Sequence, residues 1–205
     1  MKLKSVAVSP EISSFLDNIK NEFDVFFNFK ISDPLLFLLY NHEDLDIIWG
    51  KRTEPWFVGA FKNNSIFILN PDVYESESNH KKEEFWMHLK HEYCHVYYTQ
   101  ITGVHYPVWL NEGLASLLSG KKLAQNNIDK SKLLSVCDYF KTPDRDVYAI
   151  GHFWIKYLID NFGKDKLLSL IYKIDKGVDA QKFSEEFYRV YGVRFNKESL
   201  NKLLD

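Results

Sequence analysis

Lys90 to Gln100 reads KHEYCHVYYTQ, and this stretch decides how the rest of the chain is interpreted because it holds two histidines four residues apart. Residues at positions i and i+4 of an α-helix lie on one face, so the imidazoles of His91 and His95 are expected to reach the same metal ion. Glu92 follows His91 directly, and its side chain is long enough to reach a water molecule beside that ion. The pattern is HExxH, in which the glutamate acts as a base and is not a ligand.

The next apolar segment, Val108 to Ser119, reads VWLNEGLASLLS and supplies a third candidate ligand. A loop with a glycine and a proline separates it from the histidines and allows the chain to turn back on itself. A second helix is expected there, with Glu112 near its start. A catalytic zinc ion typically has three protein ligands and an open position for water, and His91, His95 and Glu112 would supply these three.

HEYCH followed by WLNEGLA resembles the gluzincin branch of the zinc metallopeptidases, especially the small peptidase-MA-like proteins that share its core. The segment Val147 to Leu170, VYAIGHFWIKYLIDNFGKDKLLSL, is similar to the tyrosine-led helix that follows the two metal-binding helices in that group. The resemblance is specific from about Trp56 to Leu170. It implies a zincin-like fold, a bound Zn²⁺ ion and hydrolysis of peptide bonds.

The resemblance also implies roles for individual side chains. Glu92 would take a proton from the water as general base and later pass it to the leaving amine. The oxyanion of the tetrahedral intermediate needs a donor besides the metal, and Tyr148 stands where similar proteins place a tyrosine or a histidine. His152 lies one turn further along the same face. For both Tyr148 and His152, the alternative is ordinary helix packing or exposure to solvent.

Several residues near the motif have simpler interpretations. His88 is expected at the surface or hydrogen-bonded to a ligand, because the ligand set is complete without it. Cys94 is expected in the core. Asn111 and Ser116 are candidates for a hydrogen bond that orients a ligand, although longer gluzincins have an acidic residue at the position of Ser116. The remaining histidines lack a partner at ligand spacing and are predicted to be loop or surface residues: His42, His80 and His105.

The chain as a whole predicts an α+β fold in a single domain over residues 1–205, with a small antiparallel or mixed sheet early and mostly helices late. The elements expected before the motif are a helix capped by Ser9, a strand buried on both sides at Pro34–Tyr40, a short helix at His42–Trp49, and a hairpin of strands Trp56–Phe61 and Ser65–Leu69. The helices expected after the motif are Val108–Gly120, Ser131–Phe140, Asp146–Phe162, Lys164–Asp175, Asp179–Tyr191 and a short one after Asn196.

The hairpin has a functional interpretation through the same resemblance. In gluzincins, the strand before the HExxH helix lies at the rim of the cleft, and the peptide substrate adds to it as an extra strand. Ser65–Leu69 or its partner strand would then bind substrate through backbone hydrogen bonds. The alternative is an ordinary sheet edge.

Composition limits the other classes of function. The 205 residues are 45% hydrophobic and 16% aromatic, which excludes a wholly disordered chain. With 26 basic and 28 acidic side chains and no long basic run, no nucleic-acid partner is expected. The apolar run after the N-terminal lysines is too short for a signal peptide, and no stretch is long enough to span a membrane. With only two cysteines, a cytoplasmic protein is expected.

Three functions remain open. The first is a zinc metallopeptidase that cuts internal bonds of peptides or proteins, because no separate domain is available to bind a free amino terminus. The second is a peptidase for one dedicated protein. The third is a metal-binding scaffold, or protein-interaction module, without turnover. Glu92 argues against the third, since loss of the base is the simplest route to loss of activity. The substrate and the oligomeric state stay open.

Overall fold

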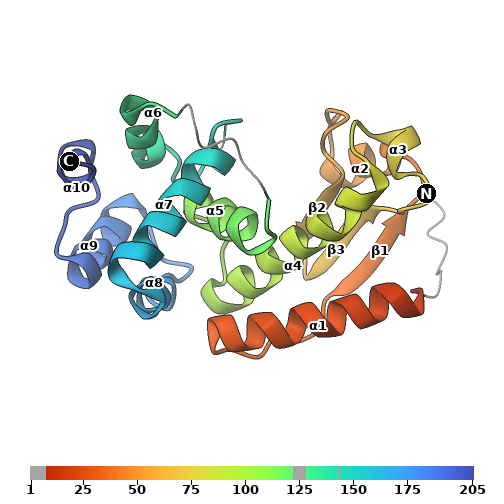
Figure 1. Ribbon diagram of the computed structural model, residues 1–205, viewed down its shortest axis with the longest axis horizontal. Coiled ribbons are helices and arrows are strands. Elements are labelled where there is room, and N and C mark those ends of the chain that lie inside the picture. Colours follow the sequence, from red (N-terminus) through yellow and green to blue (C-terminus); the bar gives the residue numbers. More distant parts are fainter. Residues whose placement is uncertain (1–7, 122–127, 143) are drawn as a thin grey trace. The chain divides into compact units, whose positions relative to one another are not determined.

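The computed structural model describes residues 8–121, 128–142 and 144–205 (Figure 1). It is an α+β protein with many helices and one small sheet, as predicted. The chain divides into two compact units, Met1–Tyr97 and Tyr98–Asp205. The expectation of a single domain stays a prediction. Most of the N-terminal stretch for which no signal peptide was expected lies outside the described residues.

The first unit contains the sheet and the metal-binding motif. Its elements in chain order are α1 (Pro10–Phe27), β1 (Leu35–Leu39), α2 (His42–Trp49), β2 (Gly59–Lys62), β3 (Ser65–Leu69), α3 (Tyr74–Glu77), a 3-10 helix (Lys82–Glu84) and α4 (Phe85–Thr102). The last turn of α4 belongs to the second unit. The short helix α3 was not predicted, because its sequence lies within a polar connection.

The sheet is mixed and has the order β1-β3-β2. β1 runs parallel to β3, and β2 runs antiparallel to it with Gly59 opposite Ile68. Asn63 and Asn64 have φ values of 50° and 55° in the turn between β2 and β3, which confirms the predicted hairpin. The prediction that β1 is buried on both sides is wrong, because this strand lies at an end of the sheet and Leu35 is 63% exposed.

Helix α1 forms as its sequence predicts and packs along α4. The hydroxyl of Ser9 accepts a hydrogen bond from the backbone N–H of Ile12 at 3.3 Å, which caps the helix. The ring of Phe27 stacks on Tyr97 with 5.1 Å between the centroids, and the Tyr97 hydroxyl donates to the carboxylate of Asp24 at 2.6 Å. Figure 1 shows α1 running beside α4. These contacts hold the helix that carries the two histidines.

The helices and strands assigned to the described residues of the second unit are all helices. It contains α5 (Val108–Leu118), α6 (Lys130–Leu134), a second 3-10 helix (Ser135–Asp138), α7 (Val147–Phe162), α8 (Lys164–Ile171), α9 (Ala180–Tyr191) and α10 (Lys197–Leu203). The helix predicted at Ser131–Phe140 is therefore two shorter pieces. Its core is aromatic, and the Trp109 ring stacks on Phe195 with centroids 5.4 Å apart.

Helices α5 and α7 cross with their backbones in contact. A methyl group added at Gly151 of α7 would lie 2.4 Å from the carbonyl oxygen of Trp109, and one added at Gly113 of α5 would lie 2.4 Å from the Gly151 carbonyl carbon. Only glycine leaves room for this approach. The start of α5 is fixed as well, because the N–H of Val108 donates to the carbonyl of Phe140 at 2.9 Å. Both features position the residue before Gly113, which is Glu112.

Within the described ranges, no helix is both long and apolar enough to cross a membrane.

We expect Gly151→Ala to lower the free energy of unfolding by about 2 kcal/mol, because the added carbon overlaps backbone atoms that have no room to move. Urea unfolding measures the loss. Gly177→Ala is the matched control, since its added carbon would meet only the side-chain ends of Asp175 and Lys182, at 3.2 and 3.6 Å. Equal stabilities of the two variants would contradict the close crossing.

Candidate metal centre

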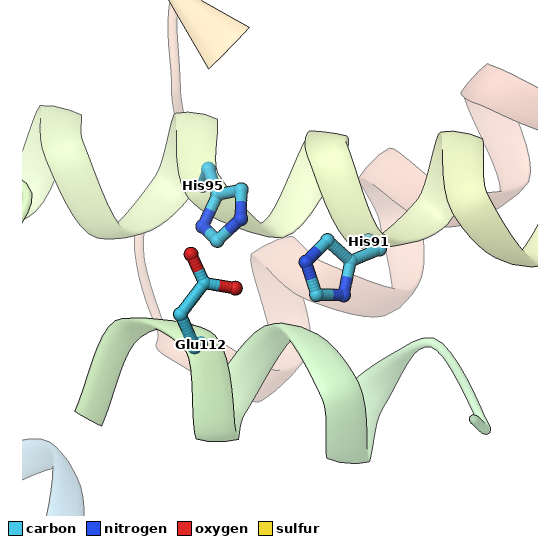
Figure 2. A group of neighbouring side chains, drawn as sticks. All are labelled: His91, His95 and Glu112. Atoms are coloured by element: carbon cyan, nitrogen blue, oxygen red, sulfur yellow. The ribbon is translucent and has the colours of Figure 1, made fainter. Parts of the chain in front are cut away.

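The two histidines of the motif lie on one face of α4. His91 and His95 are each 8% exposed, and their ring centroids lie 4.8 Å apart with the ring planes at 88°. The nearly perpendicular rings are consistent with two imidazoles that approach a common point from successive turns. Figure 2 shows both side chains on the same side of the helix. The predicted helical geometry of the motif is therefore present.

Glu112 of α5 completes a group of three candidate ligands. His91, His95 and Glu112 each offer one ligand atom, and these atoms all lie within 4.8 Å of one another. In Figure 2 the Glu112 carboxylate is directed toward the two imidazoles. The expected grouping of these three residues is confirmed, and the group is suited to bind a metal ion.

The donor set and its spacing fit a small divalent cation. Two donors at the usual zinc distances in a tetrahedral site lie about 3.3 Å apart, so the three atoms need to close by at most about 1.5 Å. Small side-chain rotations are enough for this change. Neutral imidazole with carboxylate is a combination common to zinc and to several other transition metals. Three protein ligands would leave a fourth position open for water.

Glu92 lies beside this group and packs against strand β2. A methyl group added at Gly59 would lie 3.1 Å from Cγ and 3.3 Å from Oε1 of Glu92. The glutamate side chain therefore lies against the bare backbone of Gly59, where any larger residue would crowd it. The sequence predicted the position of Glu92 on the helix but did not predict this contact.

His88 is buried, with an exposed fraction of 8%, and is hydrogen-bonded. Its Nδ1 lies 2.6 Å from the hydroxyl of Tyr74, which is fully buried. Burial raises the pKa of Tyr74, and the negative charges of Glu92 and Glu84 raise that pKa further. His88 is not among the grouped ligands, as expected, but a surface position is wrong. Nothing in the sequence singled out Tyr74, because it lies in a polar segment distant from the motif.

His80 lies in the loop between α3 and the first 3-10 helix, as its predicted loop or surface position allows, and its ring is hydrogen-bonded there. Its Nε2 lies 3.0 Å from the carbonyl oxygen of Trp56, and its Nδ1 lies 3.3 Å from the carboxylate of Glu84. Its ring is 4.4 Å from that of His88, edge to face. His42 is also engaged, since its Nε2 lies 2.8 Å from the Thr53 hydroxyl. The hydrogen bonds of both histidines stabilise the segments around them.

His152 of α7 is placed in the packing of the second unit. It is 6% exposed, and the backbone of Ser116 in α5 is close enough to act on the pKa of its imidazole. Burial lowers the pKa of the His152 imidazole, and the nearby charge of Lys156 lowers it further. Its burial agrees with the alternative that His152 packs between helices. Tyr148 is half-buried, with the Lys121 ammonium 5.2 Å from its ring centroid. A catalytic role for either residue stays a prediction.

Asn111 and Ser116, the two residues proposed to orient a ligand, differ in their hydrogen bonding. The side-chain amide of Asn111 donates to the carbonyl of His105 at 3.2 Å. The Ser116 hydroxyl is buried and makes no hydrogen bond within the described part of the chain, so it does not brace a ligand there. Cys94 is fully buried, as predicted for a core residue.

Comparison with protein-family models, with curated proteins and with solved structures finds no match to this chain. The functional assignment therefore rests on the residues and their geometry.

Alanine in place of His91 or His95 is expected to reduce the bound metal from about one ion per chain to nearly none, because loss of a direct ligand costs more than the 10- to 100-fold in affinity typical of outer partners. Elemental analysis of protein purified without a histidine tag measures this. The control is His105→Ala, which removes an exposed imidazole. Retention of metal by His91→Ala would contradict the assignment.

A pH effect is expected at His152. Its pKa is lowered in the folded state, so below the ordinary histidine pKa the unfolded chain binds more protons than the folded protein. Stability therefore falls as the pH drops below about 6.5, by at most about 1.4 kcal/mol per pH unit for this group. His152→Gln should reduce this slope in urea unfolding, whereas His105→Gln should leave it unchanged. An unchanged slope in His152→Gln would show that His152 is not the group responsible.

Proposed function

We propose that this protein is a zinc-dependent metallopeptidase of the gluzincin type, with a zincin-like core and activity on internal peptide bonds. One observation carries the proposal. His91, His95 and Glu112 bring their ligand atoms together, and Glu92, the residue after the first histidine, lies on the same helix. This combination is the one that metal-assisted hydrolysis of peptides requires.

His91, His95 and Glu112 would hold the metal. Zn²⁺ bound there would supply Lewis acidity and lower the pKa of a coordinated water from 15.7 to about 7. Two imidazoles and one carboxylate form the ligand set expected for a catalytic zinc, whereas structural zinc sites usually have four protein ligands. The donor chemistry thus favours zinc for this group over the oxygen-seeking cations magnesium and calcium.

Glu92 would act as the general base. Its carboxylate accepts a proton from the attacking water and later delivers that proton to the leaving amine. Gly59 supports this role, because the absence of a side chain there leaves the space that Glu92 occupies. Tyr148 is the proposed donor to the oxyanion, and loss of such a donor typically costs about 10² to 10³ in rate. The structure favours packing over catalysis for His152.

Strand β2 is the proposed binding strand for substrate. β3 pairs with β1 on one side and β2 on the other, so Ser65–Leu69 has no edge to which a peptide can add. β2 pairs with β3 alone among the described strands, and its Gly59 contacts Glu92. A peptide added to β2 would lie beside the general base and would need no free terminus, which supports cleavage of internal bonds.

The partner in this proposal is a peptide or protein substrate. Nucleic acids and membranes are not proposed as partners, and the expected cytoplasmic location stays a prediction. A bound metal without turnover would instead describe a scaffold. Replacement of Glu92 separates these two functions, because a scaffold does not need a general base.

Glu92→Gln is expected to reduce the rate of peptide hydrolysis by about 10² to 10⁴, because it removes general base catalysis. Its metal content should equal that of the wild type, since Glu92 is not among the ligands. Profiling on a peptide library, combined with elemental analysis, measures both quantities. Glu83→Gln is the control, because Glu83 is exposed in the 3-10 helix just before α4. If wild type and Glu92→Gln behave alike toward every peptide, the scaffold function is favoured.

A further inference from the structure

We propose that Tyr74 and His88 are positioning residues for the Glu92 carboxylate. In this arrangement Tyr74 fixes the His88 imidazole, and His88 directs its second N–H toward Glu92. The inference rests on the proposed function, in which Glu92 is the general base. It assigns a task to a buried pair that metal binding leaves unused.

The first argument is the position of His88 on α4. His88 lies four residues before Glu92, so both side chains are on the same face of the helix. Helical side chains lean toward the N-terminal end, and the Glu92 side chain therefore leans over the turn that carries His88. The His88 side chain is removed from bulk solvent, with an exposed fraction of 8%. A buried imidazole N–H requires an acceptor nearby, and a carboxylate one turn away is a strong one.

The second argument is the hydrogen bond from Tyr74. The hydroxyl lies 2.6 Å from His88 Nδ1, and both residues are buried. Burial and the charges of Glu92 and Glu84 keep the pKa of Tyr74 well above neutral pH, so its hydroxyl carries a proton to donate. When Nδ1 accepts that hydrogen bond, the proton of a neutral imidazole is on Nε2. Tyr74 thereby selects the tautomer with a donor available to Glu92.

The third argument is that the neighbours of this network leave little freedom. His80 packs edge to face on the His88 ring, with 4.4 Å between the centroids, and limits its rotation. The Glu92 side chain lies within 3.1 to 3.4 Å of the place that a Cβ atom at Gly59 would take. The Glu92 side chain is thus packed close to Gly59. Its charge is also near enough to raise the pKa of Tyr74. A base confined in this way pays less entropy to reach the attacking water, and misplacement by 1 Å can cost about 10² in rate.

The first experiment observes the His88 ring directly in metal-loaded protein with ¹⁵N-labelled histidine. Long-range ¹H–¹⁵N spectra should show an unprotonated Nδ1 and a protonated Nε2 for His88, with the signals assigned by their loss in His88→Gln. Glu92→Gln should shift the Nε2–H signal, because the carboxylate acceptor becomes a neutral amide. A proton on Nδ1, or a His88 spectrum that Glu92→Gln leaves unchanged, would overturn the proposal. This measurement needs no turnover, so it decides the positioning role even if the peptidase proposal fails.

The second experiment measures the kinetic consequence. Tyr74→Phe removes only the hydroxyl and should lower kcat by about 10-fold, with KM and metal content unchanged, because the base is misplaced while the ligands stay intact. Tyr98→Phe is the matched control, since Tyr98 is also fully buried and donates a single hydrogen bond, to the Tyr106 carbonyl at 3.0 Å. A loss of stability alone would affect both variants alike.

The outcomes separate the two proposals. An active wild type with equal kcat in Tyr74→Phe and Tyr98→Phe would overturn the positioning role and leave the peptidase function standing. A loss of kcat in Tyr74→Phe that merely parallels a loss of bound metal would also overturn it. An inactive wild type would refute the peptidase function, and the His88 spectra would then decide the inference. Those spectra also decide it if Tyr74→Phe does not fold.

Discussion

The four-residue spacing of His91 and His95 on one rigid helix is the constraint on which the rest of the structure depends. Once these two imidazoles share a face of α4, the places of the neighbouring positions are fixed as well, because every residue of a helix has a set angle around its axis. Glu92 then lies beside the ligand pair and close to Gly59 of β2, and His88 lies one turn before it. The α1 contacts matter because they hold this one helix in place.

Local patterns made much of the fold predictable. Ser9 with Pro10 signals a helix start, Asn63 with Asn64 signals a tight turn, and the HExxH spacing signals a helical pair of ligands. Each of these signals lies within a few residues, and the structure contains all three features. Glu112 was also expected, since it follows the motif in a second apolar helix. These predictions succeeded because each depends on neighbours in the sequence.

The features that sequence reasoning missed depend on residues far apart. The Tyr74 hydroxyl with His88, and Gly59 with Glu92, are contacts between different elements that no periodicity reveals. The exposure of Leu35 was missed because an apolar run does not show whether its strand will have one neighbour or two. His152 has the spacing of a site residue, yet it is buried on α7 and close to the backbone of Ser116 in α5, which its spacing alone does not reveal.

The two-residue turn at Asn63 and Asn64 has a consequence for how this chain tolerates change. Its length sets the strand register, which places Gly59 opposite Ile68 and its bare backbone against Glu92. If one inserted residue made the pairing slide by one position, Ala60 would occupy the place of Gly59, and alternate side chains would exchange faces of the sheet. A methyl group would then intrude on the glutamate. An insertion in this short connection would thus affect the Glu92 carboxylate without altering a single residue near it.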